Sequence, residues 1–257
     1  MKIADDTFRS ARKRLLKMHF ESGVGHIGGN LSCLDALLIL HHEYIGASER
    51  FILSKGHSAG ALYVALWSRG LVSDAQLAQF HRDDTLLAGH PPAAGLPGIR
   101  FATGSLGHGL SLAAGTALAL KLKRETGMVY CLTSDGEWQE GATWEALIFA
   151  AHHRLHNLTI LVDHNNLQGF GRTADVASMS PLGVKLGGFD VALQTVDGHD
   201  PEAIRAALEV PGNTCRVIVL ETRKGHGVSF MQDRMEWHYL PLNEQDYRRA
   251  LLEIEAQ

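Results

Sequence analysis

The chain has 257 residues, of which 45% are hydrophobic and 20% are charged, and this balance excludes a disordered or fibrous protein. Its net charge of −4 argues against a nucleic-acid-binding surface, which requires a basic excess. The sequence shows neither an apolar run of about 20 residues nor a signal sequence, so we expect no membrane segment and no secretion. Cys33 and Cys131 lie in apolar stretches, as expected of buried thiols in a reducing cytoplasm.

Helical and strand patterns alternate along the chain. The elements expected in the first part are, in order, a helix over 7–22, a helix opened by the capping-box pattern Ser32–Asp35 and reaching about Tyr44, a strand over 51–53, a helix over 58–69 and a short capped helix over 73–80. Residues 82–106 are rich in proline and glycine, and we expect a long irregular loop there. A loop of this length in a compact domain is usually functional.

The second part continues the alternation. The expected elements are a helix over 110–123, a strand over 128–133, a helix over 143–154, a strand over 158–163, a glycine-rich loop, a strand over 191–196, a helix over 201–208, a strand over 216–221 and a helix over 243–255. Continuous apolar strands separated by helices predict an α/β fold with a doubly wound, mainly parallel sheet and helices on both faces. Since the composition does not change along the chain, we expect a single domain over residues 1–257.

Polar residues follow two consecutive strands of this predicted sheet. Asp135 and Gly136 come after the first strand, and Asn165 comes after the next. Carboxyl ends of parallel strands share one edge, where ligands bind. Asp135, Asn165 and the Leu167 carbonyl would offer three oxygens to Mg²⁺, leaving positions for water and phosphate oxygens. Each loop taken alone is better explained as an ordinary turn, but the pairing favours a metal–diphosphate site.

Asp135-Gly136 followed by Asn165 resembles the thiamine-diphosphate motif, and the flanking sequence is similar to the N-terminal, diphosphate-binding domain of transketolase in its bacterial split form. The segments that carry this resemblance are, in order, Ser22–Ser32, Ser54–His57, Gly89–Pro91, Thr103–Leu110, Ser134–Gly141, Asp197–Asp200, Lys224–Met231 and Trp237-His238. Any one of them is a weak signal, whereas the whole series in this order is specific.

The resemblance implies a thiamine-diphosphate- and Mg²⁺-dependent enzyme that transfers a two-carbon ketol unit from a ketose (phosphate) to an aldose (phosphate). Asp135, Asn165 and the Leu167 carbonyl would hold Mg²⁺. Leu106 would support the bent cofactor. The residues expected to contact the cofactor are His57, Gly104, Leu106, Asp135, Gly136, Glu137, Asn165 and His238.

Catalytic histidines are also implied by the resemblance. Most of the 15 histidines are expected at the surface or in the core, whereas His26, His57, His90 and His238 lie in glycine-rich loops at motif positions. A pKa near the working pH suits histidine to moving the hydroxyl protons of a sugar.

Two glutamates enter the helix after the motif. Glu140 and Glu145 match family carboxylates at the interface between two cofactor sites, which implies a role in proton communication. On the residues alone, compensation of the helix dipole is an equal explanation.

Several positions depart from the family pattern. Ser134 replaces the usual first glycine, and His81, followed by Arg82, stands where transketolases commonly carry a phosphate-binding arginine. His226 occupies a variable position, and Tyr239 stands where glycine is usual. The departures at 81 and 239 leave the identity of the sugar, and whether it is phosphorylated, open.

In the family, the glutamate that activates the cofactor lies on a pyrimidine-binding domain, which we expect on a separate chain. The resemblance therefore implies a C-terminal partner subunit, assembly as a dimer of heterodimers and a cytoplasmic location. The alternatives are a 1-deoxyxylulose-phosphate-synthase-like or specialised ketol-transfer subunit, and a non-catalytic regulatory homologue. A histidine-rich zinc hydrolase is disfavoured because no HExxH or similar ligand spacing is present.

Overall fold

The computed structural model describes residues 2–257, which form two compact units. The helical unit comprises the chain up to Tyr44, Gly56–Ala102 and Thr222–Gln257, and the sheet unit comprises Ile45–Lys55 and Thr103–Glu221. Each unit is therefore assembled from segments that are distant in the sequence. The single domain expected over the whole chain stays a prediction.

The sheet unit is built on parallel strands. They are β1 (Arg50–Leu53), β2 (Val129–Ser134), β3 (Leu158–His164), β6 (Ala192–Asp197) and β7 (Arg216–Glu221). Within the described residues they form one five-stranded sheet in the order β1-β2-β3-β7-β6, with every neighbouring pair parallel. Every residue of β2 is buried, as expected of a central strand covered on both faces. The predicted fold class is confirmed.

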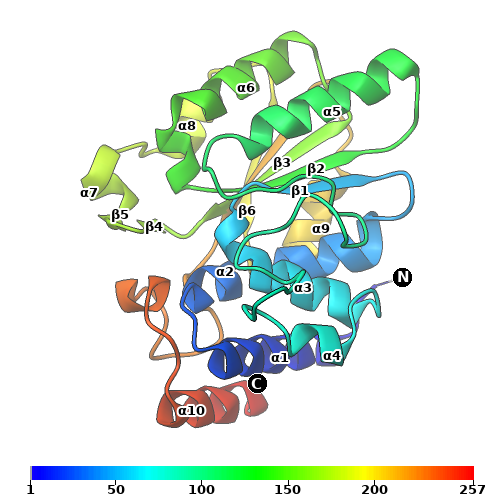
Figure 1. The fold of residues 1–257 in the computed structure, drawn as a ribbon. Coiled ribbons are helices and arrows are strands. Elements are labelled where there is room, and N and C mark those ends of the chain that lie inside the picture. The colour runs from blue at the N-terminus through cyan, green and yellow to red at the C-terminus, as the bar shows by residue number, and fades with distance from the viewer. Residues whose placement is uncertain (1) are drawn as a thin grey trace. The chain divides into compact units, whose positions relative to one another are not determined.

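The direction in which the chain winds decides which face of the sheet each crossover helix covers. α5 (Gly109–Lys123) and α6 (Gly141–His152) precede β2 and β3, and they lie side by side above the sheet in Figure 1. α9 (Pro201–Glu209) connects β6 back to β7, so the winding reverses there. Because such crossovers are right-handed, the reversal places α9 on the opposite face from α5 and α6. The sheet is thus doubly wound.

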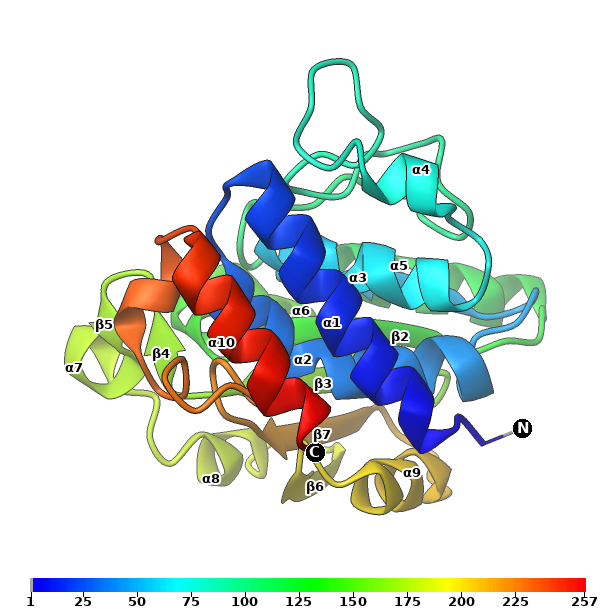
Figure 2. The same ribbon diagram turned by 90° about the horizontal axis from the view of Figure 1, so that it is seen from below.

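The helical unit has α1 (Asp5–Ser22), α2 (Ile27–Ile39), α3 (Ala59–Ser68), α4 (Asp74–Leu77) and α10 (Glu244–Glu255). α1 and α10 lie along each other in Figure 2, and α2 packs against both α1 and α3. All 13 residues of α2 are buried. A helix that is buried on every side loses the amphipathic periodicity by which helices are recognised in a sequence.

The predicted start of this second helix was wrong. α2 begins at Ile27 rather than at Ser32, and it gives way to a π-helical turn over Leu40–Tyr44. His26 precedes it in a left-handed conformation, with φ at 65°. The Ser32 hydroxyl donates to the Gly29 carbonyl (3.0 Å), inside the helix, instead of capping it. A capping-box pattern inside a buried helix therefore led to a wrong prediction of where the helix begins.

The remaining predicted helices and strands are present, most of them within two residues of their expected ends. Ser73 and Gln76 form the expected capping box, although α4 ends at Leu77, earlier than predicted. The glycine-rich loop after β3 holds three short elements that the sequence pattern does not predict. These are β4 (Leu167–Gln168), β5 (Gly171–Arg172) and α7 (Thr173–Ala177). A further short helix, α8 (Leu182–Leu186), precedes β6.

The structure also describes the state of the cysteines and the character of the helices. Cys33, Cys131 and Cys215 are all buried and are not joined by disulfides. In the part of the chain that the structure describes, no helix has the length and apolarity needed to cross a bilayer.

Candidate functional site

Asp135 sits at the carboxyl end of β2, directly before a turn of 3-10 helix over Gly136–Gln139. Its side chain is 4% exposed, and it accepts from the amides of Gly136 (2.8 Å) and Asn166 (2.5 Å). Asn166 follows the end of β3 and has φ at 63°, which turns its backbone toward the carboxylate. Two strand ends are thereby joined by one carboxylate, and the expected juxtaposition of the two loops is present.

Asn165 lies at the same edge of the sheet, after β3, and is 6% exposed. Its Oδ1 accepts from the Leu167 amide (3.1 Å), and its Nδ2 donates to Asp163 Oδ2 (3.3 Å). Leu167 begins the β4–β5 hairpin, where it pairs with Arg172. All three proposed oxygen donors, from Asp135, Asn165 and Leu167, therefore belong to the ends of β2 and β3 in the sheet unit.

The electrostatics of this edge favour a cation. Burial, followed by the nearby charge of Asp163, raises the pKa of Asp135 to about 7. A buried carboxylate with such a pKa is short of compensating positive charge, which a bound divalent cation supplies. Carboxylate, amide and carbonyl oxygens are also the donors that Mg²⁺ prefers. The residues present therefore fit a magnesium ion.

Gly136 is buried in the turn after Asp135, and Gln168 lies close to it. An added Cβ there would lie 3.3 Å from the Cβ of Gln168, so a side chain would crowd the turn. Gln168 is itself fixed, because its amide donates to Gln139 Oε1 (2.7 Å). Glycine at 136 avoids this crowding, and it also suits the close backbone approach that phosphate-binding turns require.

Glu137 is fully buried and is held within the protein. Its carboxylate accepts from the Ser54 hydroxyl and from the amides of Gly107 (3.1 Å) and Ser134 (2.8 Å). Burial raises its pKa. Glu137 therefore connects the ends of β1 and β2 to the loop before α5, and its predicted contact with the cofactor stays a prediction.

The loop before α5 carries Gly104 and Leu106, which were predicted to contact the cofactor. Leu106 is 36% exposed, on the same loop as Gly107, whose amide donates to the buried Glu137 carboxylate. Gly107 has φ at 84°, and an added Cβ would lie 2.8 Å from the side chain of Glu140. Glycine at 107 thus allows the loop to pass close to the start of α6.

A histidine cluster lies in the helical unit. His26 precedes α2, His57 lies in the 3-10 turn Gly56–Ser58, and His238 ends the 3-10 turn Met235–His238. The ring centroids are 5.7 Å apart for His26–His57, 5.2 Å for His26–His238 and 5.9 Å for His57–His238. All three side chains are half-buried. Three of the four predicted histidines are therefore brought together.

Two buried polar residues hold this cluster. Asn30 donates from Nδ2 to the carbonyls of His26 (2.8 Å) and His57 (3.3 Å), which ties two of its loops. Lys224, 2% exposed, lies with Nζ 2.9 Å from His238 Nδ1. An ammonium group can only donate, so Nδ1 of His238 accepts and its ring hydrogen resides on Nε2.

His90, the fourth predicted histidine, lies on the long loop that begins directly after His81. The Tyr63 hydroxyl donates to the His90 carbonyl (3.3 Å). Partial burial, followed by the charge of His90, lowers the pKa of His81. Arg82 turns its guanidinium to the Glu21 carbonyl (3.2 Å).

Glu140 and Glu145 are exposed at the start of α6. Glu140 is the residue before the helix, and Glu145 lies within its second turn. Their assignment to an interface stays a prediction.

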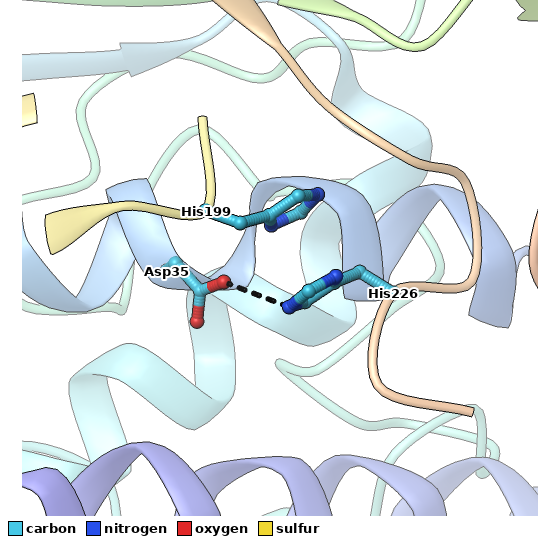
Figure 3. Close-up of side chains that lie close together, drawn as sticks. All are labelled: Asp35, His199 and His226. Carbon is cyan, nitrogen blue, oxygen red and sulfur yellow. Dashed lines mark ion pairs between the residues drawn. The ribbon is translucent and has the colours of Figure 1, made fainter. Parts of the chain in front are cut away.

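Tyr239 and His226, two of the positions that depart from the family pattern, have well-defined neighbours in the helical unit. Tyr239 is 57% exposed, and its carbonyl lies where a Cβ on Gly25 would be, so that glycine is required. His226 Nε2 lies 3.9 Å from Asp35 Oδ2 (Figure 3), and Arg12 contacts the other carboxylate oxygen at 2.5 Å. His226 therefore belongs to a charged group inside the helical unit.

Buried polar residues around both sites were not predicted from the sequence. Lys55 and Asp163 form an ion pair in the sheet unit, and both side chains are completely buried. A signal was present, since Lys55 and Lys224 are charged residues inside motifs that carry the resemblance. Asp163 lies near the end of an apolar strand, where a buried charge requires a partner.

Comparison with known proteins gives a consistent result. Residues 39–253 match the family model described as transketolase, thiamine diphosphate binding domain. An apulose-4-phosphate transketolase subunit of Actinobacillus succinogenes is 33% identical, over 97% of this chain and 95% of that protein. The 6-deoxy-6-sulfo-D-fructose transketolase subunit SqwG of a Clostridium species is 34% identical, over 96% of this chain and 94% of that protein.

Solved structures show the same fold. The transketolase of Leishmania mexicana superposes with a TM-score of 0.89 at 24% identity, over 99% of this chain and 42% of that chain. The transketolase of Campylobacter jejuni superposes with a TM-score of 0.86 at 25% identity, over 99% of this chain and 43% of that chain. The chain thus spans about two fifths of these transketolases and nearly the full length of the two transketolase subunits.

Proposed function

Because the chain belongs to the transketolase family through its thiamine diphosphate binding domain, we propose that it is the diphosphate- and Mg²⁺-binding subunit of a two-subunit ketol transferase. The proposed reaction moves a two-carbon ketol unit from a ketose or ketose phosphate to an aldose or aldose phosphate. The observation that carries the proposal is the meeting of Asp135 and Asn165 at the ends of β2 and β3.

Asp135, Asn165 and the Leu167 carbonyl would hold Mg²⁺, with the Gly136 turn beside the diphosphate. When bound, thiamine diphosphate supplies a carbon nucleophile and an acceptor for electrons, and the protein supplies orientation and electrostatics. A bound cation would compensate the buried carboxylate, so metal and cofactor binding should depend on each other. Leu106 and Gly104 are proposed to contact the cofactor from the loop that Glu137 anchors.

The histidine cluster is proposed to handle protons of the sugar. His26, His57, His90 and His238 would donate to and accept from its hydroxyl groups. His238 carries its ring hydrogen on Nε2 because Lys224 occupies Nδ1, so its Nε2 edge is a hydrogen-bond donor in the neutral state. Half-buried rings suit this role, because they retain access to protons while their orientation is fixed.

A second subunit is proposed to supply the pyrimidine-binding domain and its catalytic glutamate. Two observations support it. Two relatives of matching length, those of Actinobacillus succinogenes and of the Clostridium species, are named as transketolase subunits, and the solved transketolases are more than twice as long as this chain. We propose a dimer of heterodimers, with Glu140 and Glu145 at the interface between cofactor sites.

Recognition of the substrate's phosphate is proposed to depend on residues at the start of the long loop. The lowered pKa of His81 keeps its ring neutral near pH 7, so it does not replace a permanently charged arginine in binding phosphate. Either Arg82 leaves the Glu21 carbonyl to bind a phosphate, or the sugar lacks one there. Comparing kcat/KM for phosphorylated and unphosphorylated acceptors, in the wild type and in Arg82→Ala, distinguishes the two.

The test of the proposed function is reconstitution. The purified chain, with Mg²⁺ and thiamine diphosphate, is assayed for ketol transfer before and after addition of its cognate second subunit. We expect turnover only with both subunits, and its loss when the metal is chelated. Binding of the cofactor without turnover on any ketose would support a regulatory homologue, and condensation of pyruvate with an aldose phosphate would support a 1-deoxyxylulose-phosphate-synthase-like enzyme.

A further inference from the structure

The Asn165 side chain presents two chemically different ends to the proposed metal site. Its carbonyl oxygen can bind Mg²⁺, whereas its NH₂ group cannot. Oδ1 lies 3.1 Å from the Leu167 amide, and Nδ2 lies 3.3 Å from Asp163 Oδ2. A reversed amide would oppose NH₂ to N–H at one end and oxygen to carboxylate at the other. The Asp163 carboxylate therefore selects the orientation in which the oxygen stands on the ligand side.

Asp163 is itself held in place by Lys55. The two side chains are completely buried, and Lys55 Nζ binds Oδ2, the same oxygen that accepts from Asn165. Lys55 lies two residues after the end of β1, and Asp163 is the residue before the last in β3. The backbone carbonyl of Asp163 also accepts from the Asp135 amide (3.1 Å). One buried pair thus contacts the loops of both proposed side-chain ligands.

Stability is a weak explanation for this pair. A buried ion pair is commonly matched or exceeded in stability by apolar side chains of similar volume, because both charges must leave water. The middle of β3 shows the apolar solution, since Ile160, Leu161 and Val162 are completely buried. The buried charge occurs where the strand reaches the proposed ligands.

We propose that Asp163, held by Lys55, is a positioning residue that fixes the Asn165 amide with its oxygen toward the metal. The inference rests on the proposed function, because it assigns this role at the same metal site. Neither residue needs to contact the metal or the cofactor. Residues that orient metal ligands in this way typically change metal affinity by about 10- to 100-fold when they are replaced.

The decisive variant is Lys55→Met/Asp163→Leu. It removes the acceptor for Asn165 Nδ2 but leaves the net charge of the pair unchanged, so a long-range field effect is absent. The probe is Mn²⁺ in the presence of thiamine diphosphate, measured from the paramagnetic resonance signal of free Mn²⁺ with the full chain and its partner subunit. We expect Mn²⁺ affinity to fall about 10-fold. Unchanged affinity overturns the inference.

A double-mutant cycle tests whether the effect passes through Asn165. In an Asn165→Ala background there is no amide to orient, so the paired replacement should weaken Mn²⁺ binding by less than about threefold. An equal loss in both backgrounds contradicts positioning through Asn165. Lys55→Met/Asp163→Asn, which keeps an acceptor at the same place and the same net charge, provides a second route if the first paired variant does not fold, and it should lose less affinity than Asn165→Ala does; an equal or larger loss contradicts positioning by Asp163.

The matched control is Thr159→Val. Thr159 is completely buried at the opposite end of β3, where its hydroxyl accepts from Arg216 (3.0 Å). Its replacement also removes a buried polar contact from this strand, but it should leave Mn²⁺ affinity unchanged. Absence of metal-dependent cofactor binding in the wild type would instead defeat the proposed function, so the two failures are distinguishable.

Discussion

The two candidate sites of this chain are built by different means. The first is the edge of the sheet unit formed by Asp135, Asp163 and Lys55, which we call the carboxylate edge. Its side chains are completely or almost completely buried, and each is held by backbone amides or an ion pair. The histidine cluster of the helical unit is made of half-buried rings on loops and short 3-10 turns. The residues that hold these rings, Asn30 and Lys224, are themselves buried.

The difference follows from what each site is proposed to do. A small cation requires oxygens at fixed positions, which strand ends in a buried sheet supply. Proton transfer requires a group that changes its charge easily, and complete burial of a histidine prevents this. His19 and His41 of the same helical unit show the effect, since burial lowers their pKa values to about 4 and about 3.

The largest effect should follow from removing the charged metal ligand. Asp135→Ala should weaken Mg²⁺-dependent binding of thiamine diphosphate by at least about 100-fold, because the cation loses the only charge among its proposed ligands. Asn165→Ala removes a neutral oxygen and should cost roughly 10-fold. Calorimetry on the assembled protein measures both. Equal affinities for the wild type and Asp135→Ala would contradict the metal site.

The histidine cluster should separate turnover from binding. His26→Asn should lower kcat by about 100-fold, because a proton-transfer group is lost, and leave Mg²⁺-dependent cofactor affinity unchanged. Asparagine suits position 26, whose φ is 65°. Steady-state kinetics and calorimetry give the two readouts, with exposed His156→Ala as the control. A kcat equal to that of the control would exclude His26 from proton transfer.

Replacing Glu137 tests whether this buried anchor contributes to the folding stability of the chain. Glu137→Gln should lower the free energy of unfolding by about 2 kcal/mol, because an NH₂ group would oppose a backbone or hydroxyl donor. Thermal denaturation of the full chain measures the change. The exposed Glu125→Gln serves as the control, with an expected change within about 0.5 kcal/mol. Equal stability of the two variants would show that Glu137 is not an anchor.

The smallest effect concerns a buried histidine outside the cluster. The pKa of His19 is about 4 in the folded chain against 6.5 when unperturbed, so the unfolded chain binds more protons between these values. Folding stability due to His19 is therefore complete above pH 6.5 and is lost as the pH falls toward 4. Between about pH 7 and about pH 5 the loss is roughly 1–2 kcal/mol.

His19→Gln should remove this contribution. Denaturant unfolding at several pH values would show a smaller loss of stability on acidification than in the wild type, whereas the exposed His152→Gln should follow the wild type. An identical pH dependence in His19→Gln and the wild type would mean that His19 is not kept neutral by burial.

Patterns within short windows determined most of the architecture. Apolar runs such as Leu158–Val162 predicted buried parallel strands, because a strand covered on both faces has no need for polar alternation. The same logic placed Asp135 and Asn165 at one edge, since parallel strands end together. The fold class and most elements were therefore predictable before any coordinates.

Tertiary structure decided what pairs with what. Lys55 and Asp163 are 108 residues apart, and Glu137 accepts from groups that lie 83 and 30 residues before it. No local pattern contains such partners, because they are set by how strands are ordered in the sheet. The start of α2 at Ile27 was hidden for a related reason. Burial on all sides removes the periodicity that marks a helix, so only packing against α1 and α3 establishes it.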